Sequence, residues 1–216
     1  VVGTLAGGRL SEILKRFACE YQDADLTLRT ATSAEVSDLI RRGEATVGLR
    51  YDVDRLHDLD HERLATEQLQ VVCAPDHPLA GKRVARLADL RGERWIAFPE
   101  IPGRREIAAS HVFALFLTHG LGEIAWTPVD SLTAQKRLIE AGLGIALLSQ
   151  SHAADELRSG SIAAIRVGNL AASQDIVAVT RRGGFLSAAS QRLLETVRDD
   201  ARTRHHDVLV GHQFIG

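Results

Sequence analysis

The segment from Val129 to Ser149 constrains the fold more than any other part of the sequence. Ser131 is a good helix N-cap, because its hydroxyl can accept a hydrogen bond from a free backbone N–H of the first turn. Apolar residues then recur at helical spacing up to Gly142, which suits the positive φ that ends a helix. The run 144–148 follows at once without a polar face, which is typical of a strand buried on both sides. The segment therefore predicts a capped helix that returns tightly into a buried strand.

The rest of the chain alternates predicted strands and helices. Its first part reads strand, helix, strand, helix, strand, which indicates a mostly parallel sheet with helices on its faces. Thr32 and Ser33 offer the N-cap of the second helix. Residues 51–67 are polar and show no period, so we predict a connecting loop there. The expected strands are 1–2, 26–30, 46–50, 68–74, 95–98, 123–127, 144–148, 161–167 and 175–180, and the other expected helices are 10–17, 87–90, 107–117, 152–157 and 187–198.

Composition and charge exclude several classes of protein. The 216 residues are 45% hydrophobic and 25% charged, as in an ordinary globular chain. A net charge of −2 gives no global attraction to nucleic acid, and no apolar run is long enough to span a membrane. Cys19 and Cys73 show no paired spacing, so we expect buried thiols in a reducing compartment, with a disulfide as the less favoured alternative. The chain begins with Val1 and contains no methionine, so we expect a fragment or a processed product.

The order of the elements predicts two lobes, because neither half of the chain looks closed alone. We expect lobe I to be discontinuous, from residues 1–72 and 168–199, and lobe II to comprise 73–167. The tail 200–216 is either mobile or adds a short strand at 208–210. Two chain crossings between lobes would be natural hinges for closure around a ligand.

Several residues lie where α/β proteins bind ligands, at strand ends and helix N-termini. The loop 3–8 is either a tight turn or a cradle of N–H groups for a polar ligand, and Ser131 to Thr133 is a second candidate cradle. Arg50 closes a strand, and its fork suits a carboxylate, with a surface ion pair as the alternative. Phe98 ends another strand and either walls a pocket or packs in the core.

No motif indicates an enzyme, a metal site or a cofactor. His57 and His61 are four residues apart with carboxylates between them, but no helix is predicted there, which favours a solvated loop over a metal site. Cys73 and His77 are also four apart, and a structural thiol is the favoured interpretation. We therefore expect no catalytic residues, no metal and no cofactor.

Four segments together resemble one family. Residues 25–29 (DLTLR), 43–51 (GEATVGLRY), 71–80 (VVCAPDHPLA) and 131–148 (SLTAQKRLIEAGLGIALL) are similar to the effector-binding domain of LysR-type transcriptional regulators, and the likeness extends over about residues 1–199. This resemblance implies an α/β fold of two Rossmann-like lobes with an interlobe cleft, as in type 2 periplasmic binding proteins. It also implies a small-molecule effector between the lobes, and DNA binding only through an N-terminal winged helix-turn-helix that is missing from this chain.

The resemblance also implies which residues hold the effector. In this family the contacts come from the first two strand-to-helix loops, the end of the third strand and the facing loops of the second lobe. Carried onto this sequence, they are Thr4, Leu5, Ala6, Thr32, Ser33, Arg50, Phe98, Pro99, Asp130, Ser131 and Thr133.

These observations together predict a ligand-sensing domain of a cytoplasmic transcription factor. We expect an organic anion as the effector, and a homodimer or higher homo-oligomer formed through the helices 10–17 and 107–117. We also expect Arg50→Ala to weaken effector binding while leaving the fold intact. The alternatives are an extracytoplasmic solute-binding protein of the same fold and, less favoured, a two-lobed α/β enzyme.

Overall fold

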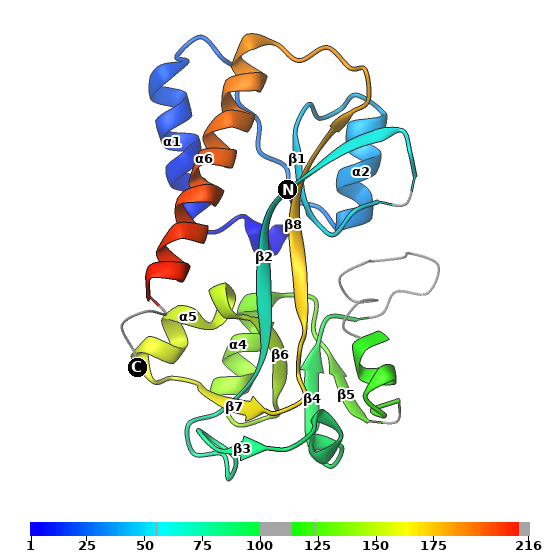
Figure 1. Cartoon of the computed structure of the whole chain (residues 1–216), viewed down its shortest axis with the longest axis vertical. Coiled ribbons are helices and arrows are strands. Elements are labelled where there is room, and N and C mark those ends of the chain that lie inside the picture. The colour runs from blue at the N-terminus through cyan, green and yellow to red at the C-terminus, as the bar shows by residue number, and fades with distance from the viewer. Residues whose placement is uncertain (55, 100–113, 123, 212–216) are drawn as a thin grey trace. The chain divides into compact units, whose positions relative to one another are not determined.

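The computed structural model describes residues 1–54, 56–99, 114–122 and 124–211 (Figure 1). Its contacts divide the chain into two compact units. Unit 1 comprises Val1–Thr66 and Asp175–Gly216, and unit 2 comprises Glu67–Gln174. The chain passes from one unit to the other inside two long strands, β2 (Leu59–Cys73) and β8 (Ser173–Arg181).

Unit 1 packs its helices on the short buried strand β1 and on β8. Its elements are the 3₁₀ turn η1 (Gly3–Leu5), α1 (Gly8–Glu20), α2 (Ser33–Arg41), β1 (Gly48–Tyr51) and α6 (Ala188–Gly211). Leu10 and Ile13 of α1 pack with Leu194 and Val197 of α6 in one core, and α2 closes a second core over β8. β1 runs antiparallel to β8, with Arg50 opposite Val177.

Unit 2 is built around the buried end of β2. Its elements are β3 (Arg83–Val84), η2 (Leu87–Leu90), β4 (Arg94–Ala97), β5 (Ala125–Pro128), α4 (Leu132–Glu140), β6 (Ala146–Ser149), α5 (Gln150–Ser159) and β7 (Ala163–Val167). Alternate side chains of β2 enter two different cores: Val71 packs with Trp95 and Phe116, whereas Val72 packs with Ile139 and Ala153. β2 thus serves as the shared wall between the two cores.

The sheets are mixed rather than mostly parallel. One sheet has the order β1-β8-β2-β7-β3, with β6 also paired to β2, and a second sheet pairs β4 with β5. β1 with β8, and β2 with β6 and β7, run antiparallel, whereas β3 with β7 and β4 with β5 run parallel. The prediction of a mostly parallel sheet is therefore wrong in this respect, although the α/β class is confirmed.

Local start and stop signals set the helix limits as predicted. Thr32 caps α2 in a capping box: its hydroxyl accepts from the Glu35 N–H, and the Glu35 carboxylate accepts from the Thr32 N–H. Ser131 caps α4 by accepting from the Ala134 N–H at 3.4 Å. Gly142 follows α4 with a φ of +74°. The opening prediction of a capped helix leading into a buried strand is confirmed.

Two predictions of secondary structure are wrong, one for a loop and one for a strand. Residues 59–66, predicted as loop, form the polar half of β2, where the Glu62 carboxylate accepts from Arg198 of α6. Residues 26–30, predicted as a strand, form no ladder; the neighbouring Ala31 makes one isolated bridge to Val2. The tail helix α6 also continues to Gly211, where a mobile end or a short strand was predicted.

Three further predictions concern the contact helices, the cysteines and a membrane span. Leu10, Ile13 and Phe17 of α1 are buried within the chain. The prediction that this helix contacts a second copy stays a prediction. Most of the other expected contact helix, 107–117, lies outside the described residues. Cys19 is exposed, against the prediction of two buried thiols. Among the helices that the structure describes, none is both long and apolar enough to cross a bilayer.

Candidate effector site

Arg50 lies at the centre of the candidate site, on the buried strand β1. Both neighbouring elements press closely on this strand: a Cβ at Gly48 would come within 2.6 Å of Val179 and 2.7 Å of Val36. The side chain of Arg50 has no solvent exposure. A charged group in such a place requires hydrogen bonds and a counter-ion, because its desolvation is costly.

Three of the Arg50 donors are used within the protein. Nε donates to the backbone oxygen of Tyr51 at 3.2 Å, and Nη1 donates to the hydroxyl of Ser37 and to Oδ2 of Asp54 at 3.1 Å. The remaining nitrogen, Nη2, is buried and has no hydrogen-bond partner among the described residues. Burial lowers the pKa of Arg50, and the nearby charge of Asp54 opposes that shift. The guanidinium thus has one buried nitrogen left for a ligand.

Asp54 is the counter-ion of Arg50, and it is shared with a second arginine. Its Oδ2 atom also accepts from Nη2 of Arg41 at 2.8 Å, while Oδ1 accepts from the Leu56 N–H at 3.0 Å. Burial opposes the ionisation of Asp54, but hydrogen bonds from the Leu56 N–H, Arg41 and Ser37 outweigh it and lower its pKa. Asp54 therefore remains charged at neutral pH.

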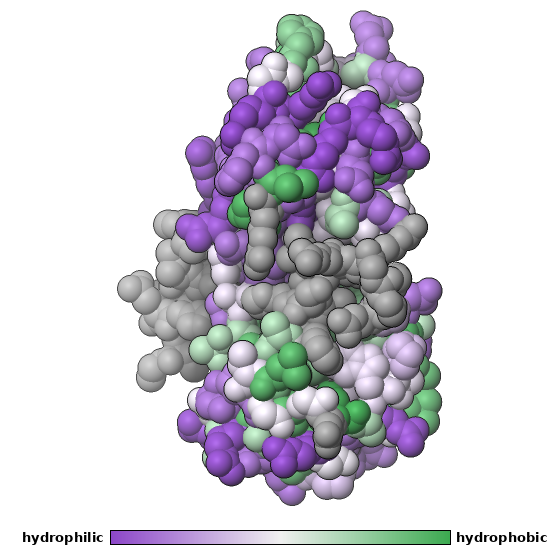
Figure 2. All heavy atoms as spheres, turned by 90° about the vertical axis from the view of Figure 1, so that its right-hand side faces the viewer, coloured by the Kyte–Doolittle hydropathy of each residue, from purple (hydrophilic) through white to green (hydrophobic). Residues whose placement is uncertain are grey.

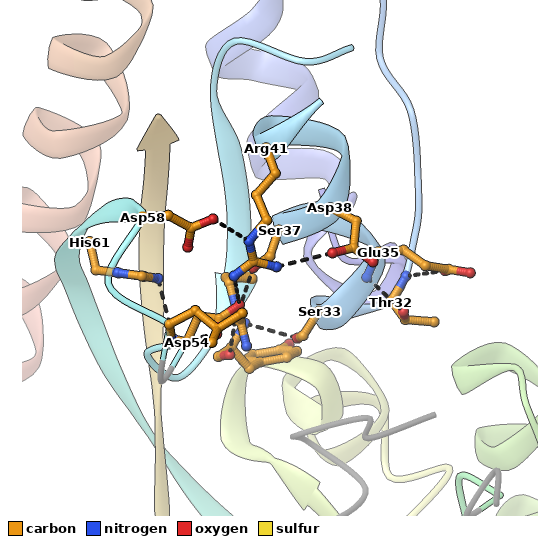
Figure 3. A network of polar contacts seen from close by, with 12 residues as sticks. Thr32, Ser33, Glu35, Ser37, Asp38, Arg41, Asp54, Asp58 and His61 are labelled. Atoms are coloured by element: carbon orange, nitrogen blue, oxygen red, sulfur yellow. Dashed lines mark hydrogen bonds and ion pairs between the residues drawn. The ribbon is translucent and has the colours of Figure 1, made fainter. Parts of the chain in front are cut away.

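Arg41 connects this pair to the surface of α2 (Figure 3). It donates to Asp38 at 3.0 Å and to Asp58 at 2.7 Å, in addition to Asp54. Nε2 of His61 in turn accepts from the backbone N–H of Asp54 at 3.2 Å. We call Ser37, Asp38, Arg41, Arg50, Asp54, Asp58 and His61 the Arg41–Arg50 network.

The predicted residues Thr4 and Ser33 both contact Tyr51, the residue that follows Arg50 on β1. The Ser33 hydroxyl accepts from the Tyr51 N–H at 3.3 Å, and Thr4 hydrogen-bonds the Tyr51 hydroxyl at 3.0 Å. Thr32 is adjacent as the N-cap of α2. Leu5 packs against the core of α1 and α6, and Ala6 is half-buried at the end of η1. Unit 1 thus brings Thr4, Ser33 and Arg50 together around Tyr51, a residue that sequence reasoning did not single out.

The predicted residues of unit 2 lie on two neighbouring segments. The Val129 N–H donates to the Ala97 oxygen at 2.8 Å, which places the residues that follow β4 beside those that precede α4. Phe98 and Pro99 are half-buried, and Asp130, Ser131 and Thr133 are exposed. The buried side chain of Gln135, which was not predicted, holds this loop by donating to the Val129 oxygen at 2.8 Å.

The other motifs have structural explanations. Asp58 pairs with Arg41 and Asp60 with Arg182, and among the residues that the structure describes no group of three or more His, Cys, Asp or Glu is placed to hold a metal ion. Cys73 is fully buried, and desolvation raises the pKa of its thiol to about 11, so it is protonated at neutral pH. Its partner in the sequence pattern, His77, pairs with Glu93 at 3.4 Å.

Sequence alignments with two named bacterial proteins cover most of this chain. It is 26% identical over 194 residues to the phosphonates import ATP-binding protein PhnC of Anaeromyxobacter dehalogenans, covering 88% of this chain and 38% of that protein. It is 24% identical over 160 residues to the HTH-type transcriptional regulator CysL of Bacillus subtilis, covering 74% of this chain and 52% of CysL. The chain therefore spans about half or less of the length of these relatives.

A solved structure shares the fold. The BenM effector binding domain with its effector benzoate superposes with a TM-score of 0.77 at 22% identity, covering 94% of this chain and 90% of that one. Residues 1–202 match the family model described as the LysR substrate binding domain. That match confirms the resemblance seen in the sequence and the type 2 periplasmic-binding-protein-like fold that it implied. This chain belongs to the family of LysR substrate binding domains.

Proposed function

We propose that this chain is the effector-sensing domain of a LysR-type transcriptional regulator and that its effector is a small organic anion. The observation that supports an anionic effector is the buried guanidinium of Arg50, whose Nη2 atom has no hydrogen-bond partner among the described residues. A carboxylate oxygen is a strong acceptor for such a donor. The fold neighbour BenM is described with benzoate, a carboxylate, as its effector, which agrees with this class of ligand.

Unit 1 supplies the most specific part of the proposed site. Arg50 would bind the carboxylate, and Thr4, Thr32 and Ser33 would contribute polar groups around it. Leu5 and Ala6, and Phe98, Pro99, Asp130, Ser131 and Thr133 of unit 2, remain proposed contacts on the basis of the family resemblance.

The functions of the whole regulator are part of the same proposal. A regulator of this family would bind DNA through a winged helix-turn-helix domain, work in the cytoplasm and assemble at least as a homodimer. An effector that binds one conformation of the domain better than another would shift its conformational equilibrium and thereby alter transcription. The family match favours this function over an extracytoplasmic solute-binding protein.

Calorimetry on an arginine variant tests the proposed ligand contact. A thermal-shift screen of small organic acids, benzoate included, first identifies an acid that stabilises the chain, because a ligand that binds only the folded state raises the Tm. We expect Arg50→Lys to weaken binding of that acid about tenfold or more, since it removes the Nη2 donor but keeps the charge beside Asp54.

The matched control is Arg182→Lys. Arg182 is a half-exposed arginine of the same unit that pairs with Asp60. Its replacement should change the Kd less than about twofold. Equal affinities of the wild type and Arg50→Lys would remove Arg50 from the site.

A further inference from the structure

The Arg41–Arg50 network contains more negative than positive charge. Arg41 and Arg50 contribute two positive charges, and Asp38, Asp54 and Asp58 contribute three negative charges, so the sum is −1. An anion that approaches Arg50 therefore meets a guanidinium that is already neutralised. The affinity of the anion for Arg50 must therefore depend on whether the Asp54 carboxylate is bound mainly to Arg50 or to Arg41.

A single carboxylate oxygen lies between the two arginines. Oδ2 of Asp54 is 2.8 Å from Nη2 of Arg41 and 3.1 Å from Nη1 of Arg50. The Asp54 side chain is 13% exposed, so its charge is only partly screened by solvent. Arg41 and Arg50 thus compete for the same atom, and a stronger hold by one weakens the hold by the other.

We propose that Asp54 is an internal counter-ion that competes with the effector for Arg50, and that Arg41 sets the strength of this competition by drawing Asp54 away. Asp54 and Arg41 are then residues that determine affinity and selectivity for anions without contacting the effector themselves. This inference rests on the proposed function, because it assumes that an effector carboxylate binds at Nη2 of Arg50.

The proposal predicts opposite effects from the two partners of one ion pair. Asp54→Asn removes the competing charge but keeps an oxygen and a similar shape, so carboxylate binding should become stronger. Arg41→Gln leaves Asp54 with Arg50 as its remaining arginine, so carboxylate binding should become weaker. If the network served only to hold the fold, both substitutions would weaken binding.

The experiment titrates benzoate and benzamide into the wild type and the variants at low ionic strength, and follows binding by calorimetry. We expect the benzoate Kd to fall about fivefold or more in Asp54→Asn and to rise about fivefold or more in Arg41→Gln, because a unit charge at this range is incompletely screened. Benzamide has the same ring without the charge, so its Kd should change less than twofold.

Asp60→Asn provides the matched control. Asp60 lies outside the Arg41–Arg50 network: it pairs with Arg182 at 3.0 Å, and its side chain is 55% exposed. We expect its benzoate Kd to stay within twofold of the wild type. Thermal unfolding of each variant shows that the compared chains are folded.

The outcomes separate the two proposals. Benzoate binding that is unchanged in Asp54→Asn, or that weakens in both Asp54→Asn and Arg41→Gln, overturns the competing counter-ion and leaves the effector site standing. An equal gain in Asp54→Asn and Asp60→Asn also overturns it, in favour of a general effect of net charge. If neither benzoate nor any acid of the screen binds the wild type or Asp54→Asn, the anion-binding function fails and the inference fails with it.

Discussion

At the scale of single residues, the structure changes how the role of Arg50 is interpreted. The sequence offered a ligand-binding arginine or a surface ion pair, and the structure shows a fully buried guanidinium paired with Asp54. Arg50→Ala would remove the buried partner of Asp54 and leave an unfilled space on β1, although Asp54 would keep its bond to Arg41 at 2.8 Å. Arg50→Ala would therefore also destabilise unit 1, against the expectation of an intact fold, and Arg50→Lys is the better test of binding.

His61 makes the Arg41–Arg50 network sensitive to pH. Its Nε2 atom accepts the Asp54 N–H, which requires the neutral ring. Burial lowers the pKa of His61 below its usual 6.5, and the charges of Arg50 and Arg41 lower it further, whereas Asp54 opposes the shift. The unfolded chain therefore binds the proton more readily than the folded one.

This shift predicts a loss of stability in acid. The stabilisation from neutral His61 is fully present above pH 6.5 and is lost as the pH falls through the lower pKa of the folded state. His61→Gln keeps an acceptor for the Asp54 N–H but does not titrate. Between pH 7.5 and pH 5.5 the Tm of the wild type should fall more than that of His61→Gln, and parallel curves would contradict a role for His61.

Sequence reasoning found Arg50 but not the residues around it. The end of a strand is a local signal, and it marked Arg50 without any knowledge of the fold. Ser37, Arg41, Asp54 and His61 come from a helix, a loop and a strand whose proximity depends on the tertiary structure. Their polar character alone does not distinguish them from ordinary surface residues.

At the scale of elements, Gly144 fixes the tight return from α4 into β6. A Cβ at this position would lie 2.5 Å from the backbone oxygen of Arg94, which accepts the Ile145 N–H at 2.8 Å. Neither backbone segment can move away without breaking this hydrogen bond. The apolar run 144–148 thus predicted the strand, while the close approach explains the glycine.

Gly144→Ala should lower the free energy of unfolding by about 2 kcal/mol, in the range found for overpacked sites. Gly92→Ala is the control in the same unit, because a Cβ there meets nothing within 4 Å, and it should change stability by less than about 0.5 kcal/mol. Urea denaturation measures the free energy of unfolding of both variants. A Gly144→Ala variant as stable as Gly92→Ala would show that the backbone accommodates the added methyl.

The helices were more predictable than the strands. Thr32, Ser131 and Gly142 act on their own neighbours in the sequence, so the limits of α2 and α4 could be read from local signals. The polar half of β2 could not be predicted from local signals, because its charged side chains pair with residues far away in the sequence, such as Arg198. Hydrophilic residues cover much of unit 1 on the face that carries α2 (Figure 2). In the sequence, residues 59–66 (LDHERLAT) show no alternation of apolar and polar residues.

At the scale of the whole molecule, the chain is two units joined through β2 and β8. The family assignment came from four segments that lie in both units, and the match to residues 1–202 confirms it. Order and spacing of segments along the chain could thus identify the family, although each segment alone is a loose pattern. The identity of the effector could not be predicted, because it depends on side chains that the tertiary structure brings together.

The central claim is that a small organic anion binds through Nη2 of Arg50. The most direct measurement is a crystal structure of the chain with the carboxylic acid that stabilises it most in the thermal-shift screen. We expect one carboxylate oxygen at hydrogen-bond distance, about 3 Å, from Arg50 Nη2, with Asp54 still bound to Arg41. A carboxylate bound elsewhere, with no contact to Arg50, would contradict the account.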